Sequence, residues 1–168
     1  MNKVFYQSSL LRYIRSKKGM ALDLASGDET FVNLLLKNHW YVDSVDLKKK
    51  TSFHKTNYSF NQIDLEKTTL SKIRRRLALR KYDLVMLFRF LHRPLFRIIP
   101  LLMKKNGLFF CETFMIQNGK GKLKTKKNML LEKELFNLKS YKLNLIKFYQ
   151  GKDLQKGNFI QAAIYKKV

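Results

Sequence analysis

The stretch MALDLASGDETFVNLLLKNHWYVDSVD, residues 20–46, decides the fold that we expect for this chain. Its first part, 20–24, is a short apolar run, which is typical of a strand buried on both faces. Small residues at 25–27 follow, and they allow the backbone to turn tightly and a ligand to come close. Apolar residues at helical spacing then predict a helix over 28–38, and 41–45 reads as a second strand. This order predicts half of a nucleotide-binding sheet, with the ligand at the strand tips and the helix N-terminus.

Beyond this stretch, strand patterns and helix patterns continue to alternate. The last two predicted strands lie close enough in sequence to pair as a hairpin. We therefore expect an α/β fold over a single domain, residues 1–168: a Rossmann-like, mostly parallel sheet with an antiparallel C-terminal hairpin and helices on both faces. The predicted strands are 20–24, 41–45, 60–63, 82–88, 108–113, 143–149 and 158–165; the predicted helices are 4–16, 28–38, 70–81, 94–105 and 129–138, with a surface loop at 118–127.

The net charge of +23 is extreme for a chain of 168 residues. An apolar content of 45% with 13 phenylalanines indicates a packed globule, so most of this charge must stand on the surface. There it favours polyanions, such as RNA, a ribosome or an acidic membrane face. The alternative is a lysine- and asparagine-rich composition, as translation of an AT-rich genome gives, with no partner implied. The densest basic patch on a predicted helix is formed by Lys72, Arg74, Arg75, Arg76, Arg80 and Lys81.

The few cysteines and histidines exclude two kinds of site. Cys111 is the only cysteine, so an internal disulfide is impossible, which fits a reducing compartment. His39, His54 and His92 lie far apart and make no metal-ligand spacing. No apolar run reaches the length of a membrane span. The first 22 residues lack acidic side chains, which a mitochondrial address would explain, but their apolar spacing equally suits a helix packed on the sheet; we expect that helix and a cytoplasmic protein.

Five segments resemble, in the same order, the motifs of the class I S-adenosylmethionine-dependent methyltransferases, and the resemblance covers nearly the whole chain. The first is similar to an acidic residue followed by small residues and glycines. The second and third are similar to strands that end in an acid, and the last two to the fourth strand and the turn before the fifth. The C-terminal part is similar to a small bacterial, tellurite-resistance-like subgroup. The segments are LDLASG (22–27), VDSVD (42–46), QID (62–64), YDLVMLFRFLHRPLF (82–96) and KNGLFFCETF (105–114).

The resemblance implies S-adenosylmethionine as the cofactor and gives three acids a role. Asp46 would accept hydrogen bonds from the vicinal ribose hydroxyls; a solvated acid at the start of a turn is the alternative. Asp64 would lie beside the adenine amino group, or simply cap the following turn. Asp23 would orient the loop and meet the cofactor's amino end, or only cap the loop. The predicted cofactor-binding residues are Asp23, Ala25, Gly27, Asp46, Asp64 and Phe88.

The sequence departs from the family's pattern at two positions. Where the family usually has a glycine two positions after Gly27, this chain has Glu29, so the glycine loop is degenerate. A carboxylate there needs space and adds negative charge near the cofactor's carboxylate, unless it turns outward from the first helical turn, where the dipole favours it. Asn106 and Gly107 replace two glycines, a mild change because asparagine tolerates left-handed conformations.

The segment after the fourth predicted strand is where this family's reaction usually takes place. Methyl transfer is an in-line displacement at a sulfonium, so positioning of the acceptor can supply much of the acceleration, and a general base is optional. Arg89 and His92 are the catalytic candidates, and Arg89 and Arg93 could hold an anionic substrate; such residues are also found packed, capping or solvated. Glu112 and Thr113 end the fifth predicted strand and are expected to border the acceptor pocket.

Two functions remain open on these residues. The first is a methyltransferase that uses S-adenosylmethionine on an unidentified acceptor, with RNA as one candidate, and the order of the motifs favours it. The second is a catalytically inactive protein of the same fold that binds RNA or the ribosome as a structural or assembly component. Glu29, the net charge and the lysine-rich loop at 120–127 favour this second function. The sequence leaves the oligomeric state open.

Overall fold

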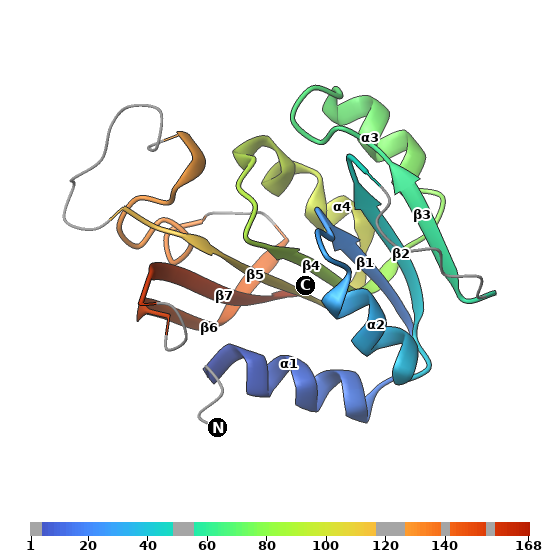
Figure 1. Ribbon diagram of the computed structural model, residues 1–168, viewed down its shortest axis with the longest axis horizontal. Coiled ribbons are helices and arrows are strands. Elements are labelled where there is room, and N and C mark those ends of the chain that lie inside the picture. Colours follow the sequence, from blue (N-terminus) through green and yellow to red (C-terminus); the bar gives the residue numbers. More distant parts are fainter. Residues whose placement is uncertain (1–4, 49–55, 117–126, 139–141, 154–156) are drawn as a thin grey trace.

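Seven strands form one sheet in the computed structural model of the chain, which describes residues 5–48, 56–116, 127–138, 142–153 and 157–168 (Figure 1). The strand order is β3-β2-β1-β4-β5-β7-β6; the first five are parallel, and β7 is antiparallel to both of its neighbours. The predicted Rossmann-like architecture with an antiparallel C-terminal hairpin is therefore confirmed. The strands are β1 Met20–Leu24, β2 Tyr41–Asp46, β3 Tyr58–Gln62, β4 Tyr82–Phe88, β5 Met103–Phe114, β6 Leu143–Lys152 and β7 Phe159–Lys167. The helices are α1 Phe5–Ser16, α2 Thr30–Lys37, α3 Leu70–Leu77 and α4 Ile99–Leu102, with a 3₁₀ helix, η1, at Arg93–Arg97.

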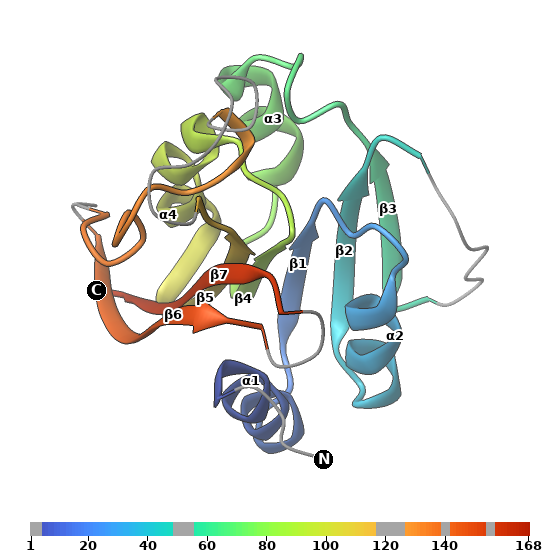
Figure 2. The ribbon, with the colours of Figure 1, turned by 60° about the vertical axis from the view of Figure 1, so that its left-hand side comes forward.

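The central strands β1 and β4 are mostly apolar because helices cover both faces of the sheet. In β1, Ala21 belongs to the apolar cluster under α1 and α2, whereas Leu22 and Leu24 belong to the cluster under α3, η1 and α4 (Figure 2). Successive side chains of a strand point to opposite faces, so a strand covered on both sides has no polar alternation. Full burial of one such leucine contributes roughly 1.5–3 kcal/mol.

The helix expected near the N-terminus is present as α1 and is joined to the sheet by Trp40. The Trp40 indole Nε1 donates a hydrogen bond to the Ile14 carbonyl oxygen at 3.0 Å. The Tyr13 ring lies 5.9 Å from the Trp40 ring, and Leu10 and Ile14 are buried in the same cluster. Trp40 therefore packs between α1 and the sheet.

The helix expected at 94–105 is divided and shorter, because β5 already begins at Met103. Residues 93–97 form η1 and residues 99–102 form α4. Pro100 explains the division, because it has no N–H group to donate to the carbonyl of Phe96 in a continuous helix.

The helix expected at 129–138 is wrong: residues 132–137 form consecutive turns, and Leu130 makes an isolated parallel bridge with Met115. Arg93 accounts for this conformation. Its guanidinium donates to the carbonyl oxygens of Lys127 and Met129 at 2.9 and 3.0 Å, and to both carboxylate oxygens of Glu134 at 2.6 and 2.8 Å. Carbonyl groups that accept hydrogen bonds from Arg93 are not available for the backbone hydrogen bonds of a regular helix.

The other predicted elements are present with shifted ends. The third strand begins at Tyr58 and the fifth at Met103, earlier than the apolar runs indicated. The loop expected at 118–127 lies almost entirely outside the described residues. None of the helices in the described ranges has the length and apolar character needed to cross a bilayer.

Candidate functional site

The loop between β1 and α2 has a left-handed backbone at every second residue. Ala25, Gly27 and Glu29 have φ values of 56°, 57° and 58°. Glycine adopts this conformation freely, whereas other residues are strained there by roughly 1–2 kcal/mol. Hydrogen bonds hold the loop in place: the Ser26 N–H donates to the Val45 carbonyl oxygen at 3.1 Å, and the Glu29 N–H to the Ser26 carbonyl oxygen at 2.8 Å. The surrounding structure thus maintains a glycine-like loop in which two of the three left-handed positions are not glycine.

Asp46, at the end of β2, joins the second strand to this loop. One of its carboxylate oxygens accepts a hydrogen bond from the Gly27 N–H at 2.9 Å. The other accepts from the N–H groups of Leu47 at 2.7 Å and Lys48 at 3.4 Å. A carboxylate has about four acceptor positions, so Asp46 keeps capacity for hydroxyl donors.

A cavity of about 310 Å³ opens beside Asp46, at the carboxyl ends of β1 to β4. Asp46 and Asp64 give it polar groups, and Ile63, Leu65 and Phe90 give it apolar walls. A cavity of this kind, apolar with a few convergent polar groups, is the form that small-molecule sites take. The lining is completed by Ala25, Leu47, Glu66 and Lys67.

Asp64 both lines this cavity and caps a turn. Its Oδ1 accepts hydrogen bonds from the N–H groups of Glu66 and Lys67, each at 3.0 Å. The two roles considered for Asp64, a place beside the adenine and the capping of a turn, are therefore compatible with each other.

Asp23 lies beneath the loop and is 2% exposed. Its Oδ2 has no hydrogen-bond partner among the described residues. Burial, and after it the charges of Asp46, Asp28 and Glu29, raises the pKa of Asp23 to about 8. A buried acid surrounded by other acids is a position where a bound cation would be stabilised.

Glu29 does not turn outward: it is fully buried, with 0% exposure. Its Oε1 accepts a hydrogen bond from the Tyr58 hydroxyl at 2.7 Å, and that hydroxyl lies 3.0 Å from the Ser44 Oγ. Its Oε2 has no partner within the described part of the chain. Of the two alternatives that the sequence left open, the structure therefore has the inward one, with the carboxylate facing Tyr58 of β3.

The described residues fit S-adenosylmethionine at this site. That cofactor carries a sulfonium, an ammonium, a ribose diol and an adenine. Three buried polar atoms of the loop region lack partners among the described residues: Asp23 Oδ2, Ser26 Oγ and Glu29 Oε2. Unpartnered acidic oxygens suit the cationic end of the cofactor, Asp46 suits the diol, and the apolar walls suit the adenine.

Ala25, Asp46 and Asp64 are the predicted site residues that line the cavity; the other five predicted residues, Phe88 and His92 among them, are not part of its described lining. Phe88 lies on the α2 side of the sheet, where its ring stacks on Phe31 with 4.4 Å between centroids. The carbonyl of His92 accepts a hydrogen bond from the Leu95 N–H at 2.9 Å at the start of η1. Neither side chain is among the described groups that line the cavity.

Sequence reasoning missed several apolar residues of the lining. Leu47 and Leu65 directly follow the predicted acids Asp46 and Asp64, and Phe90 lies two residues after the end of β4. The only sequence signal for these residues was their position, because residues that directly follow a strand lie at the same edge of the sheet as its carboxyl end.

Arg89 follows β4 with φ 57°, and its guanidinium is shared between two carboxylates. Its Nε lies 2.6 Å from the Glu112 Oε1, and its Nη2 lies 2.9 Å from the Asp153 Oδ2. The guanidinium carbon lies 4.8 Å from the centre of the Phe114 ring. Burial, and after it the charge of Asp153, raises the pKa of Glu112 to about 8. Arg89 therefore connects three elements at the carboxyl edge of the sheet.

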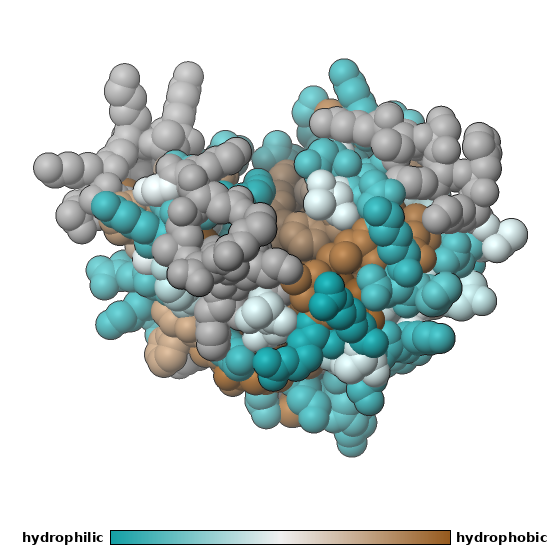
Figure 3. All heavy atoms as spheres, turned by 60° about the horizontal axis from the view of Figure 1, so that its bottom comes forward, coloured by the Kyte–Doolittle hydropathy of each residue, from teal (hydrophilic) through white to brown (hydrophobic). Residues whose placement is uncertain are grey.

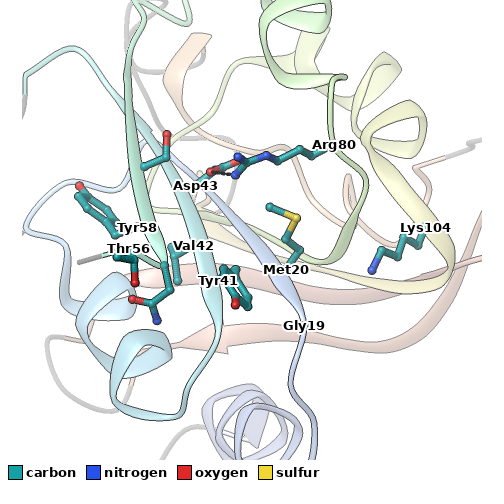
Figure 4. Close-up of a pocket in the computed structure, with 11 residues that line it drawn as sticks. Gly19, Met20, Tyr41, Val42, Asp43, Thr56, Tyr58, Arg80 and Lys104 are labelled. Atoms are coloured by element: carbon teal, nitrogen blue, oxygen red, sulfur yellow. Dashed lines mark hydrogen bonds and ion pairs between the residues drawn. The ribbon is translucent and has the colours of Figure 1, made fainter. Parts of the chain in front are cut away.

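A larger cavity, of about 490 Å³, lies at the opposite edge, where β1 to β3 begin (Figure 4). Its charged side chains are paired: Arg80 Nη1 lies 3.3 Å from Asp43 Oδ1, and Lys104 Nζ lies 2.8 Å from Asp83 Oδ2. The Tyr82 hydroxyl donates to the other Asp43 oxygen at 2.6 Å. No buried polar atom without a partner lies here among the described residues. Ligands bind open α/β sheets at the carboxyl ends of the strands, so we place the candidate site at the smaller cavity.

Helix α3 presents the basic patch that the sequence predicted. Ile73 and Leu77 are buried, and the side chains at 71, 72 and 74–76 are exposed. On the side of α1, hydrophilic side chains also cover much of the described surface, with hydrophobic ones visible near its centre (Figure 3). The exposed basic residues of α3 are Lys72, Arg74, Arg75 and Arg76.

Solved structures with the same fold include two methyltransferases. A 1,6-didemethyltoxoflavin-N1-methyltransferase from Burkholderia thailandensis, crystallised with S-adenosylhomocysteine, is 15% identical, with a TM-score of 0.69 over 98% of this chain and 77% of that one. An S-adenosylmethionine-dependent methyltransferase from Mesorhizobium loti is also 15% identical, with a TM-score of 0.69 over 95% and 96% of the two chains. The [4+2]-cyclase SpnF is 9% identical, with a TM-score of 0.67 over 96% and 80%. At these identities the likeness shows the fold alone, which is the class I methyltransferase fold.

No protein-family model matches the chain, and no curated protein is similar to it in sequence. Among the described residues, no group of three or more histidine, cysteine, aspartate or glutamate side chains could hold a metal ion.

Proposed function

We propose that this protein is an S-adenosylmethionine-dependent methyltransferase. The observation that carries the proposal is the cavity at the carboxyl ends of β1 to β4, beside a loop whose buried polar atoms lack partners among the described residues. The likeness in fold to a methyltransferase crystallised with S-adenosylhomocysteine supports it. The C-terminal sequence favours the small bacterial, tellurite-resistance-like subgroup within this fold.

Each part of the cofactor has a candidate partner in the chain. Asp46 would accept the ribose hydroxyls, Asp64 would meet the adenine amino group, and Asp23 would hold the ammonium group. The backbone at Ala25 and Gly27 would lie against the amino-acid part, where the left-handed turn lets a ligand approach closely. The apolar walls for the adenine are Ile63, Leu65 and Phe90.

When bound, S-adenosylmethionine supplies a methyl group on a positively charged sulfur. The chain's own residues then have to hold the acceptor in line and keep water out. Phe88 would support the start of α2 through its stacking on Phe31. Arg89 and His92 remain the catalytic candidates, with Arg89 in the ion-pair cluster of β5 and His92 at the start of η1.

Calorimetry with S-adenosylmethionine and S-adenosylhomocysteine tests the proposal. We expect micromolar binding of both. Asp46→Asn should weaken it about tenfold or more, because it removes the charge that strengthens hydrogen bonds from the ribose. Glu132→Gln, an exposed acid outside the cavity, is the matched control and should bind as the wild type does. Absence of binding by both ligands would overturn the proposal.

Glu29→Gly tests whether the degenerate loop limits the cofactor. The variant removes a buried carboxylate near Asp23 and gives the left-handed position its preferred residue. If the carboxylate repels the cofactor's own carboxylate, the affinity for S-adenosylhomocysteine rises. Unchanged affinity would place any weakness of binding elsewhere in the site.

A second candidate function is a catalytically inactive protein that binds RNA or the ribosome. The net charge of +23 and the exposed basic side chains of α3 favour it, and the same surface makes RNA a candidate acceptor for an active enzyme. A labelled mixed-sequence single-stranded RNA should then be retained at about 50 mM salt and released at about 200 mM. Replacing Arg74, Arg75 and Arg76 by glutamine should weaken retention and leave S-adenosylhomocysteine binding unchanged. RNA retention without cofactor binding would favour this second function over the first.

A further inference from the structure

Two arginine–glutamate pairs in this chain differ in how much of the carboxylate they use. In one, Arg93 bonds both oxygens of Glu134 at 2.6 and 2.8 Å, and the second oxygen also accepts from the Leu131 N–H at 2.8 Å. In the other, Arg89 Nε meets Glu112 Oε1 at the same 2.6 Å, but Glu112 Oε2 has no partner among the described residues. The Glu112 side chain is also the more buried, at 1% exposure against 22%. In the Arg93 pair both carboxylate oxygens are hydrogen-bonded. In the Arg89 pair the buried Glu112 Oε2 has no partner among the described residues, and a buried unpartnered acceptor calls for an explanation.

Glu112 lies at the edge of the sheet that carries the candidate cofactor cavity. In the parallel pairing of β4 and β5 it is opposite Phe88, the last residue of β4. The backbone N–H of Arg89 donates to the Glu112 carbonyl oxygen at 2.7 Å. The next residue, Phe90, lines the cavity. The segment 88–90 therefore connects the two sites: Phe90 lines the cavity, and Arg89 contacts Glu112.

The surroundings of the Arg89 guanidinium are those of a cation-binding site. Carboxylate oxygens of Glu112 and Asp153 lie within 2.9 Å of it, and the Phe114 ring lies beneath it at 4.8 Å. Carboxylates and an aromatic face are the groups that bind ammonium ions in proteins. The Arg89 side chain is 36% exposed while it covers a carboxylate that is almost fully buried, so it is placed to exchange with a cation from solvent.

We propose that this cluster is the subsite for a protonated amine on the acceptor, that Glu112 binds this ammonium group and takes its proton, and that Arg89 occupies the subsite until the acceptor replaces it. The inference rests on the proposed methyltransferase function and names the chemical class of its acceptor. In the proton transfer, an N–H bond breaks, its electron pair stays on nitrogen, and an O–H bond forms on Glu112. The nitrogen thereby regains the lone pair that it needs as a nucleophile.

The ionisation of Glu112 suits this role. Its pKa of about 8 is close to the pH at which a general base is most effective. Arg89, after β4, and Asp153, after β6, are the charged groups that contact it or act on its pKa in the described part of the chain. The completed Arg93 pair shows the opposite shift: hydrogen bonds from Arg93 and the Leu131 N–H lower the pKa of Glu134 in spite of its burial.

Benzylamine and benzyl alcohol form a matched pair of probes, since they differ in the amine that the subsite should select. Calorimetry uses the full chain saturated with S-adenosylhomocysteine. We expect benzylamine to bind at least about tenfold more tightly than benzyl alcohol, and Glu112→Gln to remove most of this preference, because hydrogen bonds to charged groups have about this strength. Glu134→Gln is the control for the loss of an arginine–glutamate pair and should keep the preference. Equal binding of the two probes, or an unchanged preference in Glu112→Gln, would overturn the proposal.

Proton release by the wild-type protein provides a second measurement, which also serves if Glu112→Gln does not fold. With a pKa of about 8, Glu112 is mostly protonated at pH 7 before the amine binds. It must release this proton to the buffer to pair with the ammonium group, and only then can it accept a proton from the bound amine. Calorimetry in two buffers of different ionisation enthalpy should therefore show proton release on benzylamine binding at pH 7. If Glu112 only anchors Arg89, benzylamine should cause no proton release. Absence of proton release would therefore overturn the proposal.

The titrations separate failure of this inference from failure of the proposed function. If S-adenosylhomocysteine does not bind, the methyltransferase proposal fails first and this inference fails with it. If S-adenosylhomocysteine binds and benzylamine does not, only the amine subsite fails. Methylation of RNA by a protein that does not bind benzylamine would assign the acceptor to RNA and overturn the amine class.

Discussion

Glu29 occupies a position where the local conformation favours glycine and the surroundings disfavour a carboxylate. Its φ is 58°, its side chain is fully buried, and one of its oxygens lacks a partner within the described residues. Each of these features costs free energy of folding. Strain of this kind clusters at functional sites, where the surrounding structure maintains it.

Glu29→Gly should therefore raise the free energy of unfolding, by about 1 kcal/mol or more, because it relieves backbone strain and removes a buried acid. The Tyr58 hydroxyl keeps a partner in Ser44 Oγ. Ala25→Gly also relieves backbone strain but removes no charge. Glycine increases the conformational entropy of the unfolded chain, which costs about 0.4–1 kcal/mol of stability, so Ala25→Gly should stabilise the protein less than Glu29→Gly. Urea unfolding measures both variants. A loss of stability in Glu29→Gly would show that the bond to Tyr58 outweighs the strain.

Asp23 should make the protein less stable as the pH rises. The folded protein holds a proton on Asp23 up to about pH 8, whereas the unfolded chain releases it near 3.8. Between these values the unfolded state binds fewer protons, so the free energy of unfolding falls with rising pH and levels off above about 8. Glu112, raised from 4.5 to about 8, adds to the same fall.

Asp23→Asn should make this fall shallower, and urea unfolding at several pH values between 5 and 9 measures it. Glu132→Gln, an exposed acid, is the control and should keep the slope of the wild type. An identical slope in Asp23→Asn would contradict the raised pKa of Asp23.

Among the structural elements, the segment at 127–138 shows how one distant side chain overrides a local pattern. Its leucines have helical spacing, yet its backbone carbonyls turn toward Arg93, more than thirty residues earlier in the chain. The strand positions were predictable because a buried parallel strand is an apolar run, which can be recognised in the sequence without knowledge of the neighbouring strands. The same holds for Asp46 and Asp64, which directly follow such runs.

Contacts between remote residues were not predictable in this way. The Arg89 cluster joins residues 64 positions apart, and the Tyr58 bond to Glu29 spans 29 positions. Nothing in the local sequence of either partner indicates the other. The sequence left the direction of the Glu29 side chain open for this reason: its burial depends on the distant Tyr58 and on a left-handed backbone that local propensity disfavours for glutamate.

Arg93→Ala should destabilise the segment at 127–138 by removing four hydrogen bonds at once. We expect a loss of about 2–4 kcal/mol in the free energy of unfolding and faster hydrogen exchange at 130–138. Arg93→Lys should recover little, because an ammonium group cannot bridge a carboxylate and two carbonyls as the planar guanidinium does. Arg97→Ala, an exposed arginine of η1, is the control. Full recovery by lysine would show that charge alone matters.

At the scale of the whole molecule, eight of the twelve acids lie at one edge of the sheet of a basic protein. Thirty-five lysines and arginines face only twelve acids. Two acids of the Arg89 cluster, Glu112 and Asp153, stand at the carboxyl edge of the sheet. Six more belong to the loop and the strand tips around the candidate cavity: Asp23, Asp28, Glu29, Asp46, Asp64 and Glu66. The site is therefore negative where the remaining surface is positive, which favours a cationic ligand in the cavity and keeps polyanions outside it.

The uncompensated charge predicts that salt stabilises the folded protein. Raising NaCl from about 20 to about 300 mM shortens the range of repulsion among the surface lysines and arginines. Each kcal/mol gained should raise Tm by about 2–4 °C for a chain of this size. Differential scanning calorimetry of nucleic-acid-free protein measures the shift, with sucrose as the uncharged control. A Tm that falls with salt would mean that ion pairs outweigh the repulsion.

The position of β7 has a consequence for how the chain is made. Residues 159–167 enter between β5 and β6, although they are translated after both. While they remain in the exit tunnel, β5 and β6 present bare backbone edges to solvent, and such edges recruit other chains. Folding of this half of the sheet must wait for the last described strand, so nascent chains stalled before it should depend on chaperones.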